Sequence, residues 1–216
     1  MRHNILWCAS LAIVTLCSTA SASVFSFNQD PFAGTNVLNT PGRQIVGGED
    51  FISFSTGQDV FALDSTVFGT DTTVHFVNAA AGNIPSSGVN VIVLETFDND
   101  NNPQTPFGAG NAADLIANQI TTAGAGFFVY FNQSLDLPRL VYSTDLSSST
   151  ADLKVLARML NLTGPSGRDA LEGFTAQNFR ITSAGADTPE PSSVSMIAMG
   201  GFFAVGCLLR RRRRDA

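Results

Sequence analysis

Cysteine, histidine and lysine are nearly absent from the middle of this 216-residue chain. The three cysteines are Cys8, Cys17 and Cys207, so the range 23–187 cannot contain a disulfide and its core must hold the fold alone. That range has one histidine, His75, and one lysine, Lys154. It has no GxSxG motif, no HExxH motif and no metal-spaced histidine pair. We therefore expect a non-catalytic protein, although a glycoside hydrolase that uses only carboxylates stays open.

Positive charge is also scarce between the two ends. The range 23–187 contains sixteen Asp and Glu residues against six Lys and Arg, a net charge of −10, whereas the whole chain has −6. Nucleic acids and anionic lipids are bound through positive patches, so we expect neither as a partner of this range. The charge suits an extracellular protein that meets divalent cations.

The first 22 residues have the order of an export signal. Arg2 and His3 form a short basic lead, and residues 5–17 are an apolar run that is too short to span a bilayer. Ala20 and Ala22 are the small residues that a signal peptidase requires. The sequence therefore predicts a signal peptide over residues 1–22, with cleavage before Ser23.

The C-terminal end combines three features after a predicted linker at 183–188. Pro189, Glu190 and Pro191 form a motif whose prolines hold the chain extended. The 16 uncharged residues 194–209 predict a single transmembrane helix of about 24 Å, just enough for a hydrocarbon core of about 30 Å. Five arginines follow, which we expect on the cytoplasmic side: Arg210, Arg211, Arg212, Arg213 and Arg214. The alternative is a C-terminal core helix of a soluble protein, which leaves the five arginines unexplained.

This order of motif, apolar segment and arginine cluster resembles the PEP-CTERM sorting signal. The resemblance covers residues 189–216 and implies a Gram-negative bacterium that makes extracellular polysaccharide or biofilm. It also implies that an exosortase recognises Pro189, Glu190 and Pro191 while the chain is held in the inner membrane. The tail would then be removed, and the body would stay at the cell surface or be released. The resemblance carries no information on the activity of the body.

The body, residues 23–182, predicts one α+β domain, mostly antiparallel β with two or three short helices. Short alternating segments rich in Phe and Val predict strands at 23–28, 51–56, 59–64, 72–78, 88–97, 126–133, 139–145 and 178–182, with 126–133 and 139–145 as a hairpin. Helical spacing predicts helices over 111–120, from Ser149 to a stop at Gly164, and around 168–171. The second of these helices would carry Leu153, Leu156 and Leu160 on one face.

Two acidic patterns point to calcium. The nonapeptides that begin at Gly48 and Gly57 place Asp50 and Asp59 in register, which resembles the β-roll repeat in which Gly-x-Asp turns cage calcium. A separate turn places Asp98, Asp100 and Asn102 at alternate positions, like the start of a calcium loop, but without its later Gly and Glu. These five residues are the candidate ligands, and no other cofactor is indicated. The alternative is a set of ordinary acidic turns on a solvated surface.

Together these patterns predict an exported surface or extracellular-matrix protein with a structural or adhesive role. The alternatives are a calcium-dependent carbohydrate-binding module and a carboxylate-based carbohydrate-active enzyme. The expected partners are signal peptidase and exosortase during processing, the inner membrane transiently, and exopolysaccharide afterwards.

Overall fold

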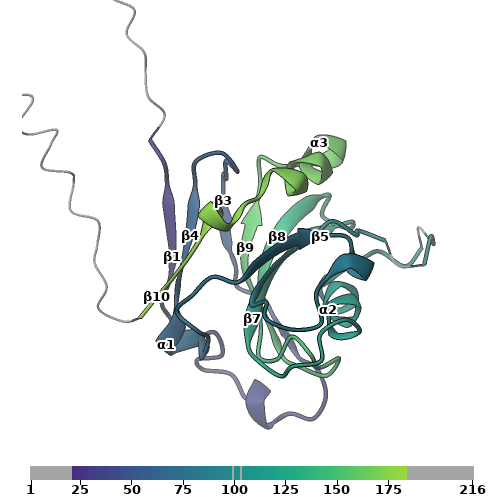
Figure 1. The fold of residues 1–216 in the computed structure, drawn as a ribbon. Helices are drawn as coiled ribbons and strands as arrows, with labels where there is room; N and C mark the ends of the chain where they lie inside the picture. Colours follow the sequence, from purple (N-terminus) through teal and green to yellow (C-terminus); the bar gives the residue numbers. More distant parts are fainter. Residues whose placement is uncertain (1–20, 99, 103, 184–216) are drawn as a thin grey trace, which may run out of the picture.

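The computed structural model describes residues 21–98, 100–102 and 104–183, which form an α+β fold with two sheets (Figure 1). The small sheet has the order β1 (Val24–Phe27), β4 (Val60–Asp64), β10 (Phe179–Thr182). The large sheet has the order β2 (Ile45–Val46), β9 (Leu153–Met159), β8 (Leu137–Ser143), β7 (Gly126–Asn132), β6 (Val91–Leu94), β5 (Phe76–Ala79), and β3 (Asp50–Ile52) also pairs with β9.

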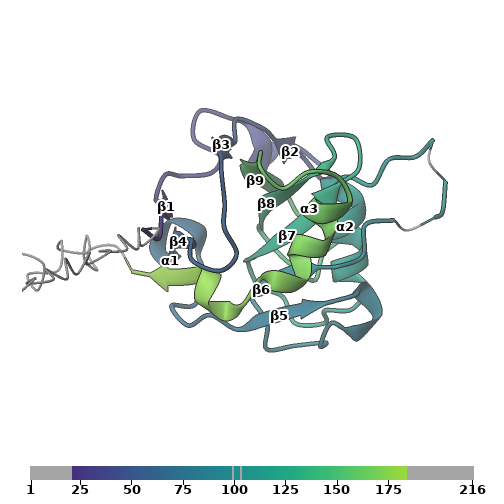
Figure 2. The same cartoon turned by 90° about the horizontal axis from the view of Figure 1, so that it is seen from above.

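The helices of the described part are short. They are α1 (Ser65–Phe68), α2 (Ala109–Ala117) and α3 (Gly164–Asp169), with 3₁₀ turns at Val37–Asn39, Ala81–Asn83, Ala170–Gly173 and Ala176–Asn178. Seen from above, the small sheet lies on one side of the large sheet and α2 on the other (Figure 2). The molecule therefore has three layers, with the large sheet in the middle.

Each interface of the large sheet has its own apolar core. Phe127 and Val129 of β7 point towards the small sheet, where the rings of Phe54 and Phe61 stack with their centroids 4.3 Å apart. The alternate residue Phe128 points towards α2 and its buried Ile116. Because successive side chains of a strand point to opposite faces, the phenylalanine-rich strand β7 contributes to both cores and all seven of its residues are buried.

Most strand pairs in the described part are parallel, so the prediction of a mostly antiparallel fold is wrong. Six of the eight pairings are parallel, and only β7–β8 and β8–β9 are antiparallel. The chain passes from β6 through α2 to β7, a crossover that puts a helix on the sheet and makes the two strands parallel. In keeping with burial on both faces, β6 reads as an unbroken apolar run rather than as an alternating one.

The helix predicted from Ser149 to Gly164 is also wrong, because residues 153–159 form strand β9. A β-bulge between Leu140 and Val141 of β8 leaves Leu156 as an extra residue on β9, between the paired Val155 and Ala157. Leu153 packs into the core next to α2, whereas the bulge puts both Leu156 and Ala157 into the core next to the small sheet, so burial on two faces gives the three residues a helix-like spacing. Gly164 begins α3 instead of ending a helix.

Other predicted elements are confirmed. Strands β1, β4 and β10, the hairpin of β7 and β8, helix α2 and the helical turns around 168–171 lie where the sequence predicts them. Strands β3, β5 and β6 are shorter than expected, and His75 lies just before β5 rather than within a strand. Lys154 lies on β9, not on a helix, and donates a hydrogen bond to the carbonyl of Gly47 over 2.6 Å.

All the strands and helices of the described part lie between Val24 and Thr182, with the two cores between them. The signal segment up to residue 20, residues 184–188 of the linker and the tail with Pro189, Glu190, Pro191 and Arg210–Arg214 lie outside the described residues. Within the described ranges, no helix has both the length and the apolar character needed to cross a membrane.

Candidate functional site

A pocket of about 440 Å³ lies at the amino ends of β5, β6 and β7. These three strands are parallel, so the loops that precede them meet at one edge of the large sheet. The lining comes from residues 69–71 after α1, His75, residues 87–90, residues 120, 122–125 and Leu146. The pocket is therefore built from segments far apart in the sequence.

Asn90 holds two of these segments together. Its side chain accepts a hydrogen bond from the backbone nitrogen of His75 over 2.8 Å and donates one to the carbonyl of Thr73 over 2.9 Å. Its own carbonyl accepts from the backbone nitrogen of Phe127 over 2.9 Å. Asn90 is buried, and these hydrogen bonds tie the segment that precedes β5 to the start of β7 at the pocket.

The pocket has few groups that could do acid–base chemistry. Asp71 and His75 are the ionisable residues of its lining, and both are exposed. The hydroxyl of Thr70 is buried and has no hydrogen-bond partner in the described part of the chain. A single carboxylate falls short of the pair that glycoside hydrolysis usually requires. The lining suits the binding of a small polar ligand through hydroxyl and backbone groups.

The candidate calcium ligand Asp59 already accepts hydrogen bonds from two backbone N–H groups. Its side chain is buried, and its Oδ1 accepts from the nitrogen of Ser23 over 2.7 Å while its Oδ2 accepts from the nitrogen of Ser55 over 2.8 Å. Asp50 is exposed at the start of β3. Since β3 pairs with β9 and β4 pairs with β1 and β10, the two nonapeptides lie in different sheets and do not stack as consecutive turns.

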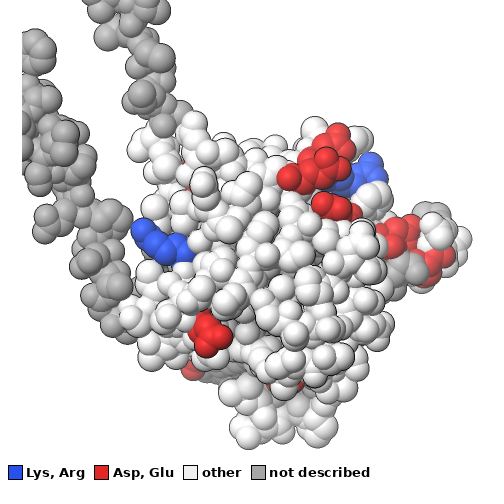
Figure 3. Space-filling view, in the orientation of Figure 1, with Lys and Arg blue, Asp and Glu red and all other residues white. Residues whose placement is uncertain are grey.

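The other three candidate calcium ligands hold their own turn. Asp98 accepts from the backbone nitrogens of Asp100 and Asn101, and Asn102 accepts from that of Gln104. Asp100 accepts from Thr105 and from the nitrogen of Asn102, and these two hydrogen bonds lower the pKa of Asp100. The loop protrudes from the body as an acidic tip (Figure 3). No group of three or more His, Cys, Asp or Glu residues suited to a metal ion is found among the described residues.

A charged cluster that the sequence analysis missed joins Arg139 and Arg158, on strands β8 and β9 of the large sheet, to Glu49 in the connection between β2 and β3. Tyr130, Arg139, Arg158 and Phe51 are successive cross-strand neighbours on β7, β8, β9 and β3. The Oε1 of Glu49, whose side chain is 5% exposed, accepts from both arginines. Burial raises the pKa of Glu49, but its backbone hydrogen bond and the two arginines lower it more, to about 2.

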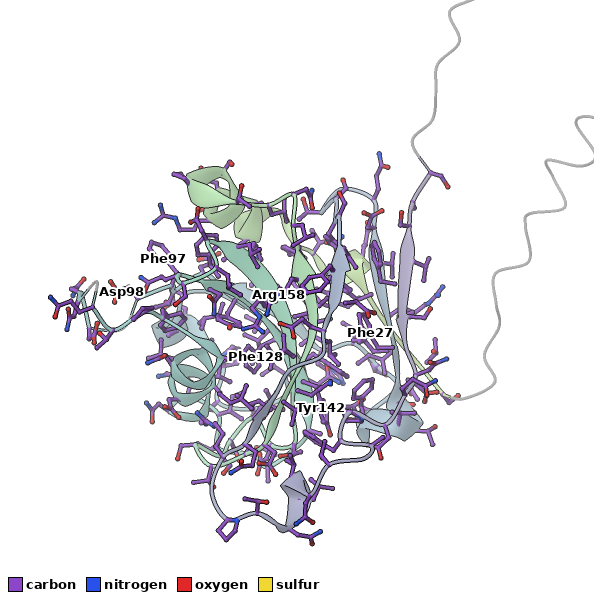
Figure 4. The ribbon with its side chains drawn as sticks, turned by 180° about the vertical axis from the view of Figure 1, so that it is seen from behind. Phe27, Phe97, Asp98, Phe128, Tyr142 and Arg158 are labelled. Carbon is purple, nitrogen blue, oxygen red and sulfur yellow. The ribbon has the colours of Figure 1, made fainter. Side chains whose placement is uncertain are left out.

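The cluster has an open side at Phe51. The guanidinium of Arg158 lies 5.3 Å from the centre of the Phe51 ring, and Phe51 is 64% exposed. Figure 4 shows Arg158 in the body of the molecule, apart from Asp98 on the protruding loop. The arginines Arg139 and Arg158, within the largely apolar strands β8 and β9, are a sequence signal that could have indicated this cluster.

No family model matches this chain, and neither a curated protein nor a solved structure matches it. The function is therefore argued from the residues of the chain itself.

Proposed function

We propose that this chain is an exported protein that an exosortase sorts through Pro189, Glu190 and Pro191. Its body acts at the cell surface or in the extracellular matrix as a non-catalytic structural or adhesive domain. The observation that carries this proposal is the order of the tail: the motif, the apolar segment 194–209 and the cluster Arg210–Arg214. The fold is compatible with a cut before Ser23, because the strands and helices of the described part begin at Val24 and end at Thr182, ahead of the motif.

The body has the properties of a domain that works outside the cell without disulfides. Two apolar cores hold it, and the fully buried side chains include seven phenylalanines, namely Phe54, Phe61, Phe68, Phe107, Phe127, Phe128 and Phe131. Burying one such side chain stabilises a fold by about 1.5–3 kcal/mol. The candidate pocket offers one carboxylate and one histidine, which supports a binding or structural role over catalysis.

The intact mass of the protein recovered from its host, with and without the exosortase, tests the proposal. We expect a species that starts at Ser23 and ends near Pro189 only when the exosortase is present. The variant Glu190→Ala should keep its tail, whereas the control Glu172→Ala, at an exposed position of the body, should be processed like the wild type. A species that retains Arg210–Arg214 in both strains would contradict the proposal.

A second candidate function is carbohydrate binding in the pocket of β5, β6 and β7. The observation that favours it is the buried hydroxyl of Thr70, which has no partner in the described part, next to the exposed Asp71 and His75. A sugar hydroxyl would satisfy such a buried group, and Asp71 could accept from a neighbouring hydroxyl.

Calorimetry with oligosaccharides cut from the host's own polysaccharide tests this second candidate. Ala123→Trp would fill the pocket and should abolish the heat of binding, whereas Ala176→Trp, at an exposed site outside the lining, should leave it unchanged. Repeating the titration with and without CaCl₂ tests the calcium dependence. Equal heats for both tryptophan variants would reject the pocket as the binding site.

A further inference from the structure

Asp59 is a buried carboxylate without a cation. Its residue is 6% exposed, and within the described ranges no lysine or arginine forms an ion pair with it. Its partners are the backbone nitrogens of Ser23 and Ser55. A buried charge is costly unless a group of opposite charge compensates it. A positive charge at one of these two nitrogens would therefore stabilise the carboxylate further.

Ser23 is the residue that follows the predicted signal-peptide cut. Its nitrogen lies 2.7 Å from the Oδ1 of Asp59. Its carbonyl accepts from the nitrogen of Val60 over 2.9 Å, and Val24 pairs with Val60 in the register of β1 and β4. Ser23 is thus held in place from its carbonyl side, independently of the residues that precede it.

Cleavage changes the chemistry of this nitrogen. When a peptidase adds water across the bond between Ala22 and Ser23, the carboxylate leaves with Ala22 and the amine stays with Ser23. A free α-amino group has a pKa of about 7.7–8.0, so at neutral pH it takes up a proton and becomes an ammonium. The hydrogen bond to Asp59 then becomes an ion pair, which is stronger than a bond from a neutral amide.

We infer that Asp59 is the receptor for the new amino terminus and that signal-peptide cleavage completes the fold. This inference rests on the proposed export, because it needs a cut before Ser23. The start has to fall at this residue: a chain that begins at Ser21 keeps a neutral amide at Ser23, and one that begins at Val24 lacks the nitrogen altogether.

The ion pair lies where the three strands of the small sheet are joined. The carbonyl of Asp59 accepts from the side chain of Asn178 over 2.9 Å, and Asn178 directly precedes β10. Asp59 itself directly precedes β4, and Ser23 directly precedes β1. Cleavage at one end of the body therefore strengthens the sheet that also holds its other end.

Thermal unfolding of two chain starts, both made in vitro, tests the inference. Chains 23–216 and 21–216 are released from a fusion partner by a protease that leaves no extra residue, and both are studied in detergent at pH 7. We expect the melting temperature of the chain that begins at Ser23 to be roughly 5 °C higher than that of the chain that begins at Ser21. Asp59→Asn should remove this difference, whereas the control Asp50→Asn, at an exposed aspartate, should preserve it.

A second measurement avoids the substitution, since Asp59→Asn places an amide against two N–H donors and can prevent folding. Enzymatic acetylation of Ser23 removes only the charge of the amino terminus. The acetylated chain should therefore have the same melting temperature as the chain that begins at Ser21. Equal melting temperatures of the two wild-type starts, or an acetylated chain that keeps the higher temperature, would overturn the inference. Either result leaves the export proposal intact, because that proposal is tested separately by the mass of the chain recovered from the host.

Discussion

The Nε of Arg158 donates to the Oε1 of Glu49 over 2.5 Å and ties the connection between β2 and β3 to strand β9. Arg139 of β8 donates to the same oxygen. One buried carboxylate therefore links three segments of the large sheet and compensates the positive charge of its two arginine partners.

Replacing this carboxylate should destabilise the protein. Glu49→Gln would leave Arg139 and Arg158, whose side chains are 13% and 29% exposed, without a negative partner. Removing one member of a buried pair costs about 3–5 kcal/mol, and the partial exposure of Arg158 places this case near about 2–3 kcal/mol. Urea unfolding measures the loss. Glu172→Gln, at an exposed glutamate, should change the stability by less than about 0.5 kcal/mol, and an equal loss in both variants would contradict the role of the cluster.

The same residue should give the protein a characteristic acid response. The pKa of Glu49 is lowered from 4.5 to about 2 in the folded chain, so the unfolded chain takes up the proton first as the pH falls. Its contribution to stability is therefore complete above about pH 4.5 and is lost between that pH and about 2. Melting temperatures of the wild type and Glu49→Gln across this range should converge at low pH. A constant difference would show that the charge of Glu49 does not stabilise the fold.

The two tyrosine side chains should lose their protons at a higher pH than a free tyrosine does. Burial, and then the charge of Asp30, raises the pKa of Tyr142 to about 12, and burial also raises the pKa of Tyr130. These are the only tyrosines of the chain, so the absorbance at 295 nm should show little tyrosinate at pH 10 in the folded protein.

The tyrosine shift also has a consequence for stability. The unfolded chain loses these protons near pH 10 and the folded chain loses them later, so stability falls as the pH rises above about 10. Tyr142→Phe should reduce the tyrosinate signal by half and leave the carbonyl of Phe68 without its 2.8 Å hydrogen bond, at a cost of about 1–2 kcal/mol. A folded protein that titrates fully near pH 10 would contradict the burial of both rings.

The sequence predicted the elements better than their pairing. Alternating Phe and Val residues revealed β1 and β4 because side-chain period is a local property. The period does not encode strand direction, so the parallel register of β1 with β4 and of β4 with β10 could not be predicted. At β9 the apolar residues face two cores and the bulge at Leu156 shifts their alternation, so the strand has the spacing of a helix.

Among the candidate sites, the sequence likewise shows those held by near neighbours and not those that join distant residues. The Asp98–Asn102 turn was visible in the sequence because its hydrogen bonds join near neighbours. Asp59 was read as a possible calcium ligand because nothing local shows that its carboxylate is held by Ser23, 36 positions away. Glu49 meets Arg139 and Arg158 at separations of 90 and 109 positions, beyond the reach of any motif.

Gly126 should be intolerant of any side chain. A Cβ at this position would lie 2.4 Å from the Cδ1 of Leu146 and 2.6 Å from the carbonyl oxygen of Asn90, and the second of these atoms belongs to the rigid backbone before β6. Gly126→Ala should therefore force β6 and β7 apart at the edge that forms the pocket, at a cost of about 2–3 kcal/mol. Gly124→Ala is the matched control, because a Cβ there meets no atom within 4 Å. Urea unfolding of both variants separates the outcomes: a loss confined to Gly126→Ala supports the tight approach of Leu146 and Asn90, and wild-type stability in both would reject it.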